Sequence, residues 1–313
     1  MRPPIVVLAG PTASGKTAAG VRLARILGGE LVGADSVQVY RGFDIGSAKP
    51  TAGELGGVRH HLLDVLDPTE RIDAMGFARL ADAAIDAIAS RGRVPIVVGG
   101  TGLWLRALLR GLVDLPPPDP AIRSSLEDEA RRLGSPALHR RLATIDPKSA
   151  AGIHPNDALR IVRALEVWEQ TGRPLGELRA AHALGAPRYP TLFVVFDRGA
   201  ERSRTRIEAR VDQMLAAGWV DETRRLLERW PPLARPFGSV GYKQIVAHLR
   251  AGIPLPETRA AIVKATRIYA RRQRTWFNKE PGVSWRTEPA ALLGREGIRR
   301  VRAHLEAHAL PST

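Results

Sequence analysis

The chain has 313 residues, of which 44% are hydrophobic and 25% are charged, as expected for a folded globular protein rather than a disordered tail. It contains no cysteine, which excludes disulfides, cysteine-ligated zinc, iron–sulfur clusters and thiol catalysis. Its chemistry must therefore use oxygen, nitrogen or a hard metal ion. No apolar run approaches the roughly 18 residues that span a bilayer, and no signal-peptide pattern opens the chain. We therefore expect a cytoplasmic protein that does not bind membranes.

The charge is strongly basic and unevenly distributed. Lysine and arginine number 47 against 32 acidic residues, a formal net charge of +15. Residues 197–280 alone hold 18 of the cations and only 9 acids. An even distribution would indicate a solvated surface or a coding preference for arginine, whereas this concentration favours a localised anion-binding face. A polyanion is the expected partner.

Short apolar runs alternate with helical patterns in the first hundred residues. Alternation of this kind predicts a parallel sheet covered by helices on both faces. An apolar run much later in the chain predicts that the sheet resumes there. Buried strands are predicted over 5–9, 31–34, 94–98 and 192–196, and helices over 17–27 and 77–90.

Prolines divide the chain into two parts. They cluster at 116–120 and again at 187–190, and almost every periodic segment between these clusters is helical. We therefore expect an α/β core formed by residues 1–118 and 190–313, with helices at its C-terminal end, and a helical insertion domain formed by residues 119–189. Helices are predicted in the insertion over 121–133, 136–143 and 156–171.

A phosphate-binding loop lies between the first predicted strand and helix. Its sequence fits G-x-x-x-x-G-K-[ST] in the context that this motif requires. Glycines let backbone N–H groups surround phosphate oxygens, Lys16 supplies a cation, and the Thr17 hydroxyl can ligate Mg²⁺. The motif alone leaves ATP, GTP and a non-nucleotide diphosphate open. The loop consists of Gly10, Pro11, Thr12, Ala13, Ser14, Gly15, Lys16 and Thr17.

Polar residues follow two more predicted strands. Asp35 ends the second strand, so it should lie over the same carboxyl edge of the sheet as the phosphate loop. The alternative role for Asp35 is a cap or turn. Gly99–Gly102 follows the third strand and could present amides and the Thr101 hydroxyl to the same ligand, or could be a tight turn. In an ordinary nucleotide hydrolase, an aspartate ends an apolar strand near the phosphate loop. Asp197 also follows a predicted strand, but it lies much later in the chain.

Two groups of cations stand out in the basic segment. The first is Arg206 and Arg210, spaced i, i+4 on a predicted helix, which are candidates for binding an anion or for surface ion pairs with nearby acids. The second forms one stripe at spacings of 3, 4 and 3, with no acid between Glu257 and Glu280 to neutralise it, which favours contact with phosphates. The stripe contains Lys264, Arg267, Arg271 and Arg274.

Taken in order, the motifs resemble the tRNA isopentenyltransferase family, the bacterial tRNA dimethylallyltransferases. The resemblance runs from residue 5 to about residue 280 and is specific because eight motifs occur together. They are Gly10–Thr17, Asp35–Tyr40, Asp44–Pro50, His60–Asp64, Val98–Leu103, His154–Asp157 with Arg160 and Arg163–Glu166, Gly241–Gln244, and Tyr269–Phe277.

The resemblance implies a P-loop NTPase-like fold and a prenyl transfer. Dimethylallyl diphosphate would donate its dimethylallyl group to N6 of the adenosine at tRNA position 37, next to the anticodon, with Mg²⁺. The phosphate loop would hold the diphosphate leaving group, so no ATP need be hydrolysed. A small-molecule kinase using ATP and a non-enzymatic RNA-binding protein are the alternatives. The kinase leaves the helical insertion and the basic segment unexplained. We expect a monomer.

The resemblance also implies residue roles. Asp35 would be the general base for the adenine amine, and Thr101 would steady the diphosphate or orient that amine. Independently of the resemblance, cleavage of the allylic C–O bond builds negative charge on the leaving group, which Lys16 is suited to stabilise, with Arg206 and Arg210 as further candidates. For Arg160 and Arg163 the alternative is an exposed helix face with nearby glutamates as partners. The four cations of the basic stripe would contact the anticodon stem-loop of the tRNA. Further contacts would come from Asp35, Ser36, Val37, Gln38, Thr101, Arg123, Leu159, Arg160, Ile161, Val162 and Arg163.

Overall fold

The computed structural model describes residues 2–182 and 186–309 and divides into two compact units. The first consists of residues up to Leu109 together with those from Pro187 onward, and the second is Arg110–Ala186. Both boundaries lie earlier in the chain than the prolines suggest. The second boundary is set by a contact, because the Arg188 backbone N–H donates to the Leu109 carbonyl at 2.8 Å and holds the returning segment in the first unit.

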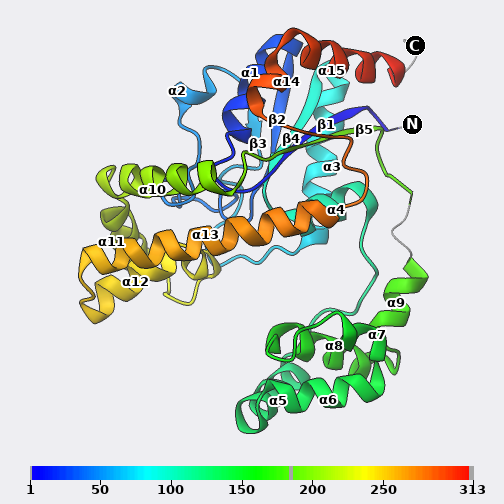
Figure 1. Ribbon diagram of the computed structural model, residues 1–313, viewed down its shortest axis with the longest axis vertical. Helices are drawn as coiled ribbons and strands as arrows, with labels where there is room; N and C mark the ends of the chain where they lie inside the picture. Colours follow the sequence, from blue (N-terminus) through cyan, green and yellow to red (C-terminus); the bar gives the residue numbers. More distant parts are fainter. Residues whose placement is uncertain (1, 183–185, 310–313) are drawn as a thin grey trace. The chain divides into compact units, whose positions relative to one another are not determined.

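The first unit is built on one six-stranded sheet (Figure 1). All its strands are parallel, in the order β3-β2-β4-β1-β5-β6. The predicted parallel sheet is thus confirmed, while β3 and β6 are too short for their sequences to show an alternation. The strands are β1 (Ile5–Ala9), β2 (Gly29–Ala34), β3 (His60–His61), β4 (Val94–Gly99), β5 (Thr191–Phe196) and β6 (Trp285–Thr287).

Helices cover both faces of the sheet. Alternate side chains of β1, such as Val6 and Leu8, pack in one cluster with Leu23, Leu292 and Val301 of α1, α14 and α15. The opposite face carries α3, which contacts β2 and β4. The ring of Phe77 in α3 stacks on that of Trp104 in α4, with 4.5 Å between the ring centroids. These helices are α1 (Lys16–Leu27), α2 (Ala52–Leu55), α3 (Ala74–Ser90), α4 (Gly102–Arg110), α14 (Pro289–Leu293) and α15 (Arg295–Ala307).

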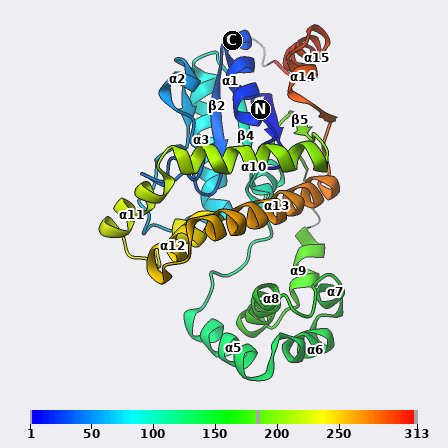
Figure 2. The same ribbon diagram turned by 60° about the vertical axis from the view of Figure 1, so that its left-hand side comes forward.

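Four helices and one 3₁₀ turn lie between β5 and β6 in the chain. The long helices α10 and α13 lie side by side in both views (Figures 1 and 2). Trp219 and Tyr242 pack edge to face at 5.5 Å and join α11 to α12. The elements are α10 (Ala200–Ala216), α11 (Trp219–Arg229), the 3₁₀ turn Arg235–Gly238, α12 (Tyr242–Ala251) and α13 (Leu255–Lys279).

The second unit is helical as far as the structure describes it. Its core includes the fully buried side chains of Leu142, Ile161 and Leu165. Across residues 2–182 and 186–309, no helix combines the length and apolar character needed to cross a membrane. The helices of this unit are α5 (Pro120–Leu133), α6 (Ser135–Ile145), α7 (Pro147–Ala151), α8 (Ala158–Thr171) and α9 (Leu175–His182).

Candidate active site

The phosphate loop joins β1 to α1 in a conformation that its sequence permits. Gly10 and Gly15 have φ values of 148° and 89°, which glycine adopts without a steric penalty. A Cβ at Gly10 would lie 2.6 Å from the Phe196 carbonyl oxygen, so the loop approaches the end of β5 too closely for any side chain. Ala13 also has a positive φ, 61°. The geometry therefore suits a loop whose amides surround an anion.

Lys16 opens α1 beneath this loop. Its ammonium donates to the Pro11 carbonyl at 3.3 Å. Burial lowers the pKa of Lys16 to about 8, the negative charge of Asp35 opposes that shift, and the nearby Arg210 adds to it. A diphosphate bound in the loop would add negative charge beside this partly buried cation.

Arginines of α10 approach the phosphate loop. Arg206 donates from Nε to the Ala13 carbonyl at 3.0 Å. Burial lowers the pKa of Arg210, an effect that the charge of Asp35 opposes. Asp212 and Glu208, the acids nearest these arginines on the same helix, are paired otherwise, since Arg259 binds Asp212 and Arg204 binds Glu208. Arg206 therefore contacts the loop, and Arg210 lies near enough to Lys16 and Asp35 for their charges to interact.

Arg198 is a further cation at the loop that the sequence analysis did not identify. Its Nε donates to the Ser14 carbonyl at 2.9 Å. Glu288, the residue after β6, lies 3.9 Å from Arg198 and 3.0 Å from Arg202. Arg198 follows β5 by two residues, so its position at the carboxyl end of a strand was the signal available in the sequence.

Asp35 lies directly after β2 and is half-buried. Its Oδ1 accepts hydrogen bonds from the backbone N–H groups of Val37 at 2.9 Å and Gln38 at 3.3 Å. This oxygen therefore caps the turn that follows β2, as the alternative interpretation required, while Oδ2 takes no part in those two bonds. Burial and the charge of Asp35 raise the pKa of Tyr269, so this phenol stays neutral beside the carboxylate.

Thr101 connects the end of β4 to the Asp35 turn. Its hydroxyl oxygen accepts a hydrogen bond from the Ser36 backbone N–H at 3.2 Å. Its own backbone N–H donates to the Ala34 carbonyl at 3.3 Å. The ends of β2 and β4 thus bring Asp35 and Thr101 together.

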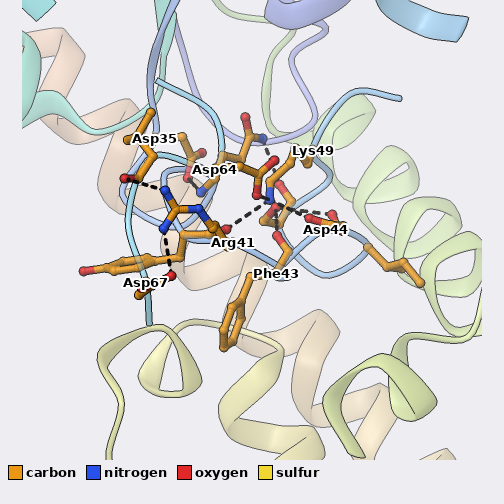
Figure 3. Close-up of polar contacts among 12 residues, drawn as sticks. Asp35, Arg41, Phe43, Asp44, Lys49, Asp64 and Asp67 are labelled. Atoms are coloured by element: carbon orange, nitrogen blue, oxygen red, sulfur yellow. Dashed lines mark hydrogen bonds and ion pairs between the residues drawn. The ribbon is translucent and has the colours of Figure 1, made fainter. Parts of the chain in front are cut away.

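Polar side chains hold the loop after β2 (Figure 3). The Gln38 amide donates to the carbonyls of Ser47 at 3.0 Å and Ala48 at 3.2 Å, so its donor is used within the protein. The Lys49 ammonium binds the carboxylates of Asp44 and Asp64, both at 2.5 Å. Of the segment assigned to tRNA contact, Ser36 and Val37 are partly exposed, while Gln38 is buried.

The basic stripe on α13 is interrupted at Arg274. Lys264, Arg267 and Arg271 are exposed. Arg274 is partly buried and lies 3.3 Å from the Asp197 carboxylate, and its Nη2 donates to the Ser203 hydroxyl at 3.3 Å. No acid within α13 neutralises Arg274, but Asp197, directly after β5, does.

The residues assigned to tRNA contact in the second unit fall into three groups. Leu159, at 74% exposure, and Arg160 lie on the surface. Ile161 and Val162 are buried in the core, so their side chains have no access to a partner. Arg123 and Arg163 each donate to the buried Glu166 carboxylate at 2.8 Å. The ion-pair alternative thus applies to Arg163, while Arg160 lies 3.4 Å from Asp157.

The sheet order and the loop between β1 and α1 define a P-loop NTPase-like fold, with a glycine-containing phosphate-loop motif, cations and a carboxylate at one sheet edge. The IPP transferase family profile matches residues 38–280. The tRNA dimethylallyltransferase of Anaeromyxobacter sp. (strain K) is 53% identical over 285 residues, 91% of this chain and 93% of that protein.

Solved structures give the same relationship. The tRNA isopentenylpyrophosphate transferase of Bacillus halodurans is similar with a TM-score of 0.72 and 36% identity, covering 99% of this chain and 98% of that one. A eukaryotic dimethylallyltransferase acting on tRNA has a TM-score of 0.77 at 27% identity, covering 96% and 77%. The chain belongs to the IPP transferase family and is a transferase.

Proposed function

We propose that this protein transfers the dimethylallyl group of dimethylallyl diphosphate to N6 of the adenosine at position 37 of tRNA, next to the anticodon. The observation that carries the proposal is the juxtaposition at one sheet edge of a phosphate loop approached by cations, after β1, and the Asp35–Thr101 pair, after the next two strands β4 and β2. The names of the relatives support tRNA as the acceptor and dimethylallyl as the group transferred.

The reaction breaks the C1–O bond of the allylic diphosphate and forms a bond from C1 to the adenine N6. Negative charge develops on the departing diphosphate, where Lys16, Arg206 and Arg210 would stabilise it. The amine lone pair is delocalised into the purine ring, so N6 must lose a proton as it attacks. Asp35 would accept that proton as general base, and Thr101 would orient the amine or the diphosphate.

The donor set fits a magnesium ion held chiefly by the substrate. Among the described residues, no group of three or more His, Cys, Asp or Glu side chains could hold a metal. Mg²⁺ commonly binds through one or two protein oxygens together with substrate phosphates. The Thr17 hydroxyl, in the first turn of α1, is the oxygen that would bind it here. A bound Mg²⁺ would neutralise charge on the departing diphosphate.

The anticodon stem-loop is the proposed binding partner. An adenosine stacked in this loop must be flipped out to reach a pocket, which requires a surface that holds the backbone. The exposed Lys264, Arg267 and Arg271 of α13, and Arg160 and Leu159 of α8, are candidates for that role. We further propose that the protein acts as a monomer in the cytoplasm.

Replacing Lys264, Arg267 or Arg271 with alanine is expected to weaken tRNA binding and to flatten its salt dependence. Removing one cation that binds a phosphate reduces the slope of log K against log salt by about 1. Filter binding across a salt series measures that slope, and the exposed Arg302 of α15 gives a control replacement. An unchanged slope in all three variants contradicts a phosphate contact by this stripe.

The kcat/KM for dimethylallyl diphosphate is expected to fall above about pH 8. The pKa of Lys16 in the free protein is lowered to about 8, so at higher pH the side chain loses the charge that attracts diphosphate. Lys16→Arg keeps its charge at every pH measured, and its lower activity should show no such decline. A profile that stays flat from pH 7 to above pH 9 in the wild type contradicts this role for Lys16.

Nucleoside mass spectrometry tests the proposed function directly. The protein is incubated with dimethylallyl diphosphate, Mg²⁺ and an unmodified tRNA whose anticodon ends in A. We expect a dimethylallyl mass gain on adenosine. Transfer of the γ-phosphate of ATP to a small molecule, with no gain on tRNA, would show instead that the phosphate loop serves a kinase.

A further inference from the structure

Gln273 of α13 joins two loops at the candidate active site. It is 7% exposed, and α13 brings it to the sheet edge from late in the chain. Its Oε1 accepts a hydrogen bond from the Thr12 backbone N–H at 2.8 Å, and its Nε2 donates to the Gly100 carbonyl at 2.9 Å. The two partners require opposite ends of the amide, so they fix its orientation.

The loops that Gln273 joins carry the two halves of the proposed reaction. Thr12 belongs to the loop proposed to hold the diphosphate. Gly100 precedes Thr101, whose hydroxyl binds the Ser36 N–H beside Asp35. The side chain of Gln273 therefore connects the loop proposed to hold the diphosphate with the end of β4, which carries Thr101 beside Asp35.

The packing at Gly100 shows how closely Gln273 fits. A Cβ at Gly100 would lie 2.4 Å from the Gln273 Nε2 and 3.3 Å from the Gly10 carbonyl oxygen. The absence of a side chain at Gly100 is therefore what lets the amide reach the carbonyl. A glycine at this position has a structural reason beyond forming a turn.

We propose that Gln273 is a positioning residue that sets the distance between the diphosphate loop and the Asp35–Thr101 strand ends. This inference rests on the proposed function, because only a transfer between two bound groups needs that distance fixed. Misplacement of reacting groups by about 1 Å can cost roughly 100-fold in rate. Loss of the Gln273 amide should thus lower kcat, while the KM for dimethylallyl diphosphate changes little.

Two substitutions separate positioning from simple stability. Gln273→Met is of similar length but neither donates nor accepts, and we expect its kcat to be about 10- to 100-fold lower at every pH. Gln273→Glu keeps an acceptor for the Thr12 N–H, but its carboxylate repels the Gly100 carbonyl. Burial beside a carbonyl raises the pKa of that introduced acid, and the positive charges of Lys16, Arg198 and Arg206 at the loop oppose the rise. Once protonated, the acid can donate again. Its kcat relative to wild type should therefore rise as the pH falls from 8 to 6.

The experiment measures kcat and KM of these variants with unmodified tRNA across that pH range, together with their melting temperatures. Gly100→Ala should reproduce the loss because its methyl displaces the amide. Gln213→Glu, an exposed position on α10, makes the same chemical change away from the site and should leave kcat unchanged. Gln273→Met with a kcat within about twofold of wild type, or a Gln273→Glu defect of equal size at every pH, overturns the inference while leaving the proposed function intact. A wild-type protein that transfers no dimethylallyl group overturns both.

Discussion

Asp35→Asn is expected to lower turnover by roughly 10²- to 10⁴-fold, the usual contribution of a general base. Asparagine has an oxygen that can accept the Val37 and Gln38 N–H bonds, so the turn after β2 should keep its conformation. It cannot accept the proton that the adenine amine must lose. Single-turnover transfer from dimethylallyl diphosphate, with tRNA affinity measured separately, distinguishes lost chemistry from lost binding.

The control for this variant is Asp73→Asn. Asp73 caps α3 by accepting the Gly76 N–H at 2.6 Å, so it tests the same change in a carboxylate that only caps. Its turnover should match the wild type. An Asp35→Asn protein with near wild-type kcat would remove Asp35 from the mechanism and leave it as a turn residue.

Asp35→Asn should also shift the pH at which Lys16 loses its charge and the protein loses affinity for diphosphate. The charge of Asp35 raises the pKa of Lys16 and so opposes the effect of burial. Removing that charge lets the Lys16 pKa fall below about 8 in the free protein. Titration with inorganic diphosphate should show the high-pH loss of affinity beginning at a lower pH in Asp35→Asn than in the wild type.

The parts of the site that could be predicted from sequence are those fixed by local geometry. Gly10–Thr17 and Asp35 follow strands whose buried apolar runs are visible in the sequence, and parallel strands bring their carboxyl ends to one edge. Arg274 shows the limit of this reasoning. Its own helix offers no acid, yet Asp197 neutralises it from the end of β5. A helix pattern contains no information on what packs against it.

Buried partners in the second unit escaped prediction for the same reason. The spacing of Arg163 and Glu166 permitted a surface ion pair, but Glu166 is fully buried and also binds Arg123 and the Asp119 N–H. A glutamate on a helix is normally solvated, so its burial depends on a fold that its local sequence does not reveal. Gln273 and Arg198 were missed likewise, since their partners lie far away in the chain.

Glu222 of α11 is the strongest case of such a contact, and its removal should have the largest effect on stability. Its carboxylate accepts backbone N–H bonds from Asp44, Ile45 and Gly46 at 3.2, 2.7 and 3.3 Å, and the Tyr242 hydroxyl donates to it at 2.5 Å. This buried carboxylate raises the pKa of Tyr242 further than burial alone does. The loop it holds leads to Lys49 and to the carbonyls that bind Gln38 beside Asp35.

Glu222→Ala is therefore expected to lower the free energy of unfolding by about 3–5 kcal/mol, because several buried donors lose their acceptor together. Glu222→Gln retains one acceptor oxygen and nearly the same shape, so it should cost roughly half as much. Urea unfolding of both variants measures the difference, with Glu228→Ala on the same helix as an unburied control. A Glu222→Ala protein within about 1 kcal/mol of the wild type would mean that the loop finds other acceptors, most simply water. In that case the loop beside Asp35 would not depend on α11 for its conformation.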